Sequence, residues 1–85
     1  MTRCGGITGL LEIAGVAHAH QLDLSAHCAP AISAHAFCAV QRLRNLEYFH
    51  DHVRIEHMLF DGVPEPVDGV LEPDRSRPGN GLELK

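Results

Sequence analysis

The stretch LSAHCAPAISAH, residues 24–35, joins a short strand to a helix and decides the fold. Leu22 and Leu24 alternate with the polar Asp23, which predicts a strand over about 22–26, ending just before His27. Pro30 suits the first turn of a helix over about 30–41, because the N–H that proline lacks would have no partner there. The stretch is therefore a strand–loop–helix unit.

The same alternation continues on either side of this unit. Upstream, a glycine turn opens an Ala/Leu-rich pattern with apolar residues at helical spacing, which predicts a helix over about 8–20. Downstream, NLEYF predicts a second strand over about 45–48, and HDHVRIEHMLF has room for a short helical turn. Helices that alternate with short strands predict an α/β fold with parallel strands. Two strands and two helices cannot close a sheet, so we expect a piece of a larger α/β structure.

The composition changes at Asp61. The last 25 residues hold four of the five prolines and four of the eight glycines, which is typical of an extended segment. Two short strands are expected within it, at 69–71 and 82–84. The predicted organisation is thus a partial α/β unit over 1–60 and a Pro/Gly-rich C-terminal segment over 61–85.

Charge and cysteine content exclude several classes of protein. The formal charge is −4, from seven Lys and Arg against eleven Asp and Glu, which argues against a nucleic-acid or anionic-membrane partner. Three cysteines without regular spacing indicate reduced thiols in a cytoplasmic protein rather than a disulfide framework. The apolar run Ile7–Ala17 imitates a signal peptide, but Glu12 interrupts it. No apolar run approaches the roughly 20 residues of a membrane span.

Two side chains lie where the predicted strands end. His27 follows the first strand, and an imidazole can act as a general base near neutral pH, although a loop histidine bonded to nearby backbone is the simpler interpretation. Glu47 occupies the equivalent place on the next strand. A protonated or hydrogen-bonded carboxyl there could donate to a developing oxyanion, while a surface or salt-bridged glutamate is the simpler interpretation. Spacing alone favours the simpler interpretation of both residues.

Two further groups could bind a metal ion. Cys28, His35 and Cys38 offer three soft ligands, but their spacing is not that of the paired ligands in structural zinc sites. The histidines of the HDH segment, 50–52, with His57 form a second group, for which a solvated loop is the simpler interpretation. We expect no metal at either place.

Taken in order, RCGGITG, LSAH and LEYF resemble the C-terminal barrel of the enolase superfamily, most closely its mandelate racemase/muconate-lactonizing group, which includes acid-sugar dehydratases. RCGGITG resembles the turn after the sixth barrel strand, LSAH the end of the seventh and LEYF the end of the eighth. PDRSRPGNGLELK resembles the family's C-terminal segment. The resemblance implies a C-terminal fragment of a (β/α)8 barrel, with about two βα units in residues 1–60 and the extended tail in 61–85.

The resemblance also implies a chemistry. In this family a base removes the proton next to a substrate carboxylate, and Mg²⁺ held by carboxylates of other barrel strands stabilises the enolate. His27 matches the family's histidine base, and Glu47 matches the glutamate that hydrogen-bonds the substrate carboxylate. The aspartate that partners this histidine in the family would lie immediately before Met1 and is absent from the 85 residues.

The chain is therefore expected to resemble part of a lyase or isomerase that acts on carboxylate-bearing sugar acids. We expect the 85 residues to bind no Mg²⁺ themselves and to be inactive alone, because neither the ion nor the aspartate partner would support the histidine. The alternatives are a non-catalytic module that binds a partner or self-associates through exposed barrel edges, and a small Cys/His metal binder.

Overall fold

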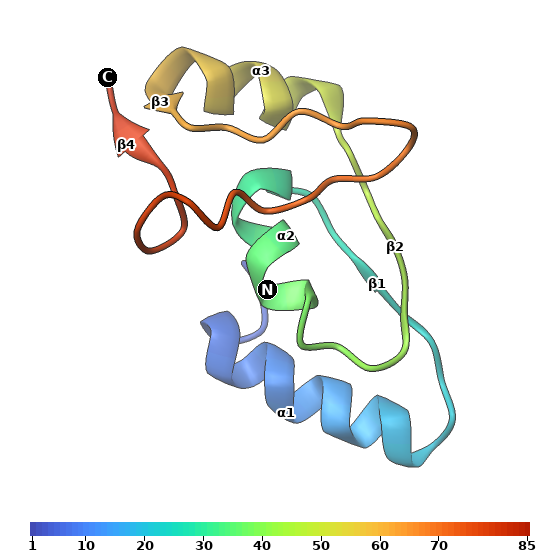
Figure 1. Cartoon of the computed structure of the whole chain (residues 1–85). Helices are drawn as coiled ribbons and strands as arrows, with labels where there is room; N and C mark the ends of the chain where they lie inside the picture. The colour runs from blue at the N-terminus through green and yellow to red at the C-terminus, as the bar shows by residue number, and fades with distance from the viewer.

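The computed structural model describes residues 1–85 as an elongated α/β structure, 41 × 26 × 25 Å (Figure 1). α1 lies at one end of the molecule and α3 at the other, with α2 and the β1–β2 pair between them. None of the three helices has the length and hydropathy to cross a membrane. The elements in chain order are α1 (Gly6–Ala19), β1 (Leu24–Ala26), α2 (Pro30–Phe37), β2 (Leu43–Leu46), α3 (His50–Leu59), β3 (Phe60–Asp61) and β4 (Glu83–Leu84).

The strands β1 and β2 pair in parallel, as predicted. Ala26 lies opposite Leu46, and the ladder ends where the Glu47 N–H donates to the Ala26 carbonyl at 3.0 Å. β2 therefore covers residues 43–46 instead of the predicted 45–48. It ends early because β1 ends at Ala26 and offers no partner beyond this last bond. As a result, Glu47 lies just after the strand rather than inside it.

A glycine turn and a proline determine where the first two helices begin. Gly5 precedes α1 with a φ of 88°, a left-handed conformation that glycine adopts without steric cost, so α1 begins two residues earlier than predicted. Pro30 is the first residue of α2, as predicted. α2 ends at Phe37 instead of residue 41, because the next N–H groups bond to carbonyls three residues back, including the Val40 N–H to the Phe37 carbonyl at 3.1 Å. This tighter turn places Val40 in the core.

The segment after β2 forms the ten-residue helix α3, where only a short helical turn was expected. The tail then returns to this helix, and β4 pairs antiparallel with β3, which confirms the strand predicted over 82–84. The strand predicted at 69–71 is wrong, since a single bridge between Val67 and Val70 forms there instead. The Lys85 N–H donates to the last carbonyl of α3 at 2.9 Å and holds the end of the tail in place.

The core is small and lies where α1, β1 and α2 meet. Apolar side chains on one side of α1 pack into it, while most large apolar side chains of that helix are exposed. The core cluster consists of Leu10, Ala26, Ala36, Phe37 and Val40. The exposed apolar side chains of α1 are Ile7, Leu11, Ile13 and Val16.

Candidate functional site

The edge at which β1 and β2 both end carries His27 and Glu47. Each residue directly follows its strand, and the parallel pairing of Ala26 with Leu46 brings both to the same edge. Both side chains are exposed to solvent. The structure thus brings together the two residues that the sequence singles out, although their chemical roles stay predictions.

The thiol of Cys28 lies between these two side chains. It donates a hydrogen bond to Oε2 of Glu47 at 3.1 Å, and its Sγ is 3.6 Å from Nε2 of His27. One ligand atom from each of the three residues lies within 4.8 Å of the other two. The sequence does not predict that Cys28 lies in this cluster. Its position directly after His27 is the one feature of the sequence that points to it.

The backbone after β1 turns sharply and directs the Cys28 thiol toward Glu47. Cys28 and Ala29 have φ values of 52° and 45°, a left-handed conformation that is uncommon for residues other than glycine. The hydroxyl of Ser33, which is fully buried, donates to the Cys28 carbonyl at 3.0 Å. This bond from α2 holds the turn in a conformation that the chain would not favour by itself.

Burial and the Glu47 carboxylate both raise the pKa of the Cys28 thiol, burial being the larger cause. Arg3 opposes the shift with a smaller effect. A thiol with a raised pKa stays protonated near neutral pH and is a poor nucleophile. Cys28 is therefore a hydrogen-bond donor to Glu47 and not an activated cysteine.

Two side chains of α3 hold the first turn of α2 beside the cluster. Nδ1 of His52 accepts a hydrogen bond from the Ala29 N–H at 3.2 Å, and the carboxylate of Glu56 accepts from the Ala31 N–H at 3.3 Å. The first N–H groups of a helix have no partner within the helix, so these contacts satisfy donors that would otherwise be unpaired. They also place α3 against the start of α2.

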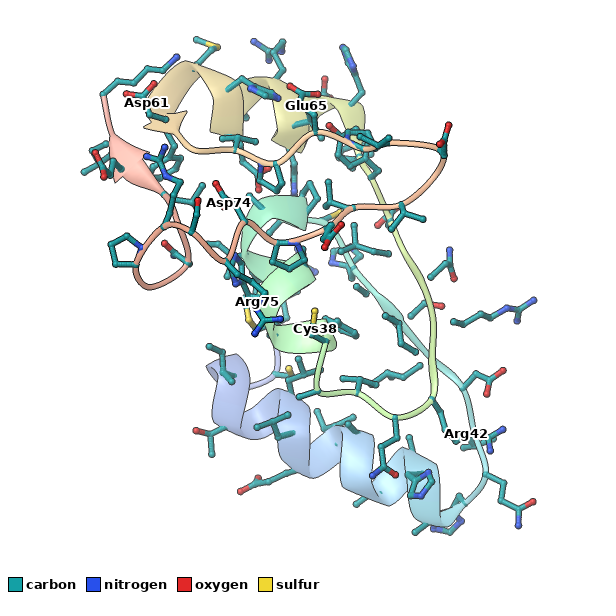
Figure 2. The ribbon with its side chains drawn as sticks, in the orientation of Figure 1. Cys38, Arg42, Asp61, Glu65, Asp74 and Arg75 are labelled. Atoms are coloured by element: carbon teal, nitrogen blue, oxygen red, sulfur yellow. The ribbon has the colours of Figure 1, made fainter.

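The other candidate metal ligands are not brought together. Figure 2 shows Cys38 at the C-terminal end of α2, whereas Cys28 precedes the N-terminal end of that helix, so Cys28, His35 and Cys38 form no common site. The Cys38 thiol donates to the Ala34 carbonyl at 3.0 Å. His52 caps α2, as described above, while Nε2 of His57 lies 3.1 Å from the Glu65 carboxylate.

Substitution of Glu56 by Gln is expected to change how stability depends on pH. Burial raises the pKa of Glu56 above its ordinary value of 4.5, with the Ala31 N–H, His52 and His57 opposing this shift. A carboxyl whose pKa is raised by folding stabilises the fold below its unfolded pKa and loses that contribution as the pH rises through its folded pKa. Urea unfolding of both proteins over a pH series should therefore show wild type losing stability relative to Glu56→Gln from about pH 4.5 upward.

Arg54→Gln is the matched control, because it replaces an exposed charged residue of the same helix whose guanidinium donates to the Met58 sulfur of α3. Its pH dependence should follow wild type. A wild-type advantage over Glu56→Gln that grows with pH would contradict the assignment and show that the hydrogen bond to Ala31 outweighs burial.

The cluster holds groups that can move protons and form hydrogen bonds. The imidazole of His27 can accept a proton, and the carboxyl of Glu47 can donate or accept a hydrogen bond. Mg²⁺ prefers six oxygen ligands in near-ideal octahedral geometry. The His27–Cys28–Glu47 cluster offers one nitrogen, one sulfur and one carboxylate, so it does not fit Mg²⁺.

The chain was compared with protein families, curated sequences and solved structures. The family model described as "Enolase C-terminal domain-like" matches residues 1–85. The chain is also similar to the crystal structure of a mandelate racemase/muconate lactonizing enzyme-like protein from Rubrobacter xylanophilus, with 64% sequence identity and a TM-score of 0.95 over 99% of this chain. The matched region is 23% of the Rubrobacter xylanophilus chain. No curated protein sequence matches.

Proposed function

We propose that this chain, which belongs to the enolase C-terminal domain-like family, carries proton-transfer groups of an enzyme that acts next to a substrate carboxylate. The observation that supports this most directly is the meeting of His27 and Glu47 at the edge where two parallel strands end. In βα barrels that edge is where substrates bind and react.

We also infer that the 85 residues are the last portion of a (β/α)8 barrel, with two βα units followed by the tail. Three features favour this: a parallel pair whose outer edges are free, an α1 face with exposed apolar side chains, and a share of 23% in the longer chain of the similar structure. The free strand edges and the exposed face of α1 are explained if further barrel elements pack against them.

In the proposed reaction, Nε2 of His27 accepts the proton that leaves the carbon next to the substrate carboxylate. The electron pair moves toward that carboxylate, and the Glu47 carboxyl is placed to hydrogen-bond it as the charge develops. Cys28 occupies Oε2 of Glu47, which leaves Oε1 to face the substrate. Cys28 is thus a positioning residue that limits the orientations of the Glu47 carboxyl.

The substrate proposed is a carboxylate-bearing sugar acid, and the reaction is a racemisation or a dehydration that begins with the same proton loss. Mg²⁺, which such an enzyme would require, has no ligand set in this chain, so its ligands would come from other elements of the enzyme. The isolated 85 residues are proposed to be inactive for this reason.

Self-association is the second candidate function. A hollow of about 640 Å³ lies between α2, β2 and the tail and is lined mainly by apolar side chains. This hollow and the exposed apolar face of α1 together place apolar surface on two sides of the small core. Such surface is expected where one protein contacts another. The lining includes Ala34, Phe37, Leu43, Tyr48, Val70 and Leu71.

Proton exchange tests the catalytic proposal. The 85 residues would replace the matching segment of the Rubrobacter xylanophilus protein, to give a hybrid that high identity should allow to fold. Exchange of the proton next to the carboxylate would be followed by NMR in D₂O, with Mg²⁺, on a panel of aldonic and aldaric acids, with the parent protein measured alongside. We expect the hybrid to exchange within about tenfold of the parent and the isolated chain to show none.

Two outcomes would count against this proposal. A folded hybrid without exchange, on an acid that the parent exchanges, would show that these residues do not supply the chemistry. Exchange by the isolated chain that disappears in His27→Ala would show that the 85 residues are active without further elements. Size-exclusion chromatography of the isolated chain tests the second candidate, since a monomer at all concentrations argues against self-association.

A further inference from the structure

We propose that His27, Cys28 and Glu47 form a binding site for a single thiophilic divalent cation of the Zn²⁺ or Cd²⁺ type. The ligands would be Nε2 of His27, Sγ of Cys28 and one carboxylate oxygen of Glu47. Such a site needs only the positions and the chemistry of these three donor atoms, and it does not require that the chain be part of an enzyme.

The three donor atoms are spaced almost as zinc requires. A Zn–S bond of about 2.3 Å and a Zn–N bond of about 2.0 Å, at a tetrahedral angle, place sulfur and nitrogen about 3.5 Å apart. The distance from Sγ of Cys28 to Nε2 of His27 is 3.6 Å, and that from Sγ to Oε2 of Glu47 is 3.1 Å. All pairs of ligand atoms lie within 4.8 Å, and rotation of the exposed His27 and Glu47 side chains would close the site.

The donor set selects the class of metal. A thiolate and an imidazole favour Zn²⁺ and its heavier analogues, and they disfavour Mg²⁺, which binds oxygen ligands. On binding, the Cys28 S–H bond breaks, an S–metal bond forms, and one proton passes to the buffer. Two anionic ligands then balance the charge of the ion. His27 and Glu47 are exposed, which leaves the fourth position open to water.

The backbone around Cys28 is already fixed in the conformation that the site uses. The Ser33 hydroxyl holds the Cys28 carbonyl at 3.0 Å, and the Glu47 N–H is bonded to the end of β1. A metal would therefore meet ligands whose main chain need not rearrange, which lowers the ordering cost of binding. If the proposed function holds, the bound ion would occupy both the base and the carboxyl and would inhibit proton exchange.

Metal titration of the full 85-residue chain tests the site. Calorimetry with Zn²⁺ should give one equivalent per chain, and Cd²⁺ should produce the ultraviolet absorption of a thiolate–metal bond. Cys28→Ser should abolish that absorption and weaken Zn²⁺ binding by at least about tenfold, and Glu47→Gln should weaken binding by about tenfold. Cys38→Ser is the matched control and should keep both signals, because Cys38 lies at the other end of α2.

Two results would overturn the proposal: less than one Zn²⁺ bound per chain, or a thiolate–metal absorption that is lost in Cys38→Ser but kept in Cys28→Ser. Should Cys28→Ser fail to fold by circular dichroism, Glu47→Gln and His27→Ala decide, and unchanged affinity in both overturns it. Since these measurements use binding alone, their failure would leave proton exchange by the hybrid unaffected, and failure of the hybrid would leave metal binding standing.

Discussion

Replacement of His27 by Asn is expected to lower proton exchange by the hybrid barrel by about 10³-fold, within the range by which general bases contribute to catalysis. Asparagine keeps a polar group of similar reach but cannot accept a proton near neutral pH. His27 directly follows β1, and its Nε2 lies in the cluster with Glu47, so no rearrangement of the strands is needed for it to face a substrate. The rate of exchange in D₂O, at saturating acid and Mg²⁺, is the measurement.

His35→Asn is the matched control. It makes the same substitution in the same stretch of sequence, at a partly buried position in the last turn of α2 that is outside the cluster. Its exchange rate should stay within about threefold of the unsubstituted hybrid if it affects packing only. Equal rates for His27→Asn and the unsubstituted hybrid would show that another group is the base.

Much of the candidate site could be predicted, because it follows from strand order. Residues directly after parallel strands lie at one edge, so His27 and Glu47 could be expected to meet once β1 and β2 were placed. The position of Cys28 could not be predicted in this way. It depends on left-handed backbone at Cys28 and Ala29, which neither residue type favours and which the buried Ser33 holds from a different element.

The fold shows the same division between local and distant causes. Pro30 and the glycine turn are local signals, and they place α1 and α2 close to where these helices occur. The β3–β4 pair joins residues more than 20 positions apart, and no local pattern specifies that pairing. For α3 the sequence predicts only a short helical turn, and the structure extends it to ten residues. The contacts of His52 and Glu56 with the start of α2 come from distant residues, and they help to hold this helix.

Gly9→Ala is expected to be the most damaging glycine-to-alanine substitution in α1. A Cβ at Gly9 would overlap the carbonyl oxygen of Cys4 and lie 2.8 Å from its carbonyl carbon. Both obstacles are backbone atoms, so the N-terminal turn must move away from the helix. Met1 and Cys4 pack against the core, and that contact would be lost. Forcing atoms into a filled site costs about 1–3 kcal/mol, and we expect the upper end of this range.

Gly15→Ala is the matched control, because it adds the same methyl group to the same helix with no atom within 4 Å. Removing glycine from a helix interior stabilises by roughly 0.5–1 kcal/mol, so the two variants should move in opposite directions. For a domain of this size each kcal/mol shifts Tm by about 4–8 °C, so Gly9→Ala should lower Tm by on the order of 10–20 °C in a calorimetric scan, while Gly15→Ala raises it. If both variants gained stability, the N-terminal turn would not be packed against α1 in solution.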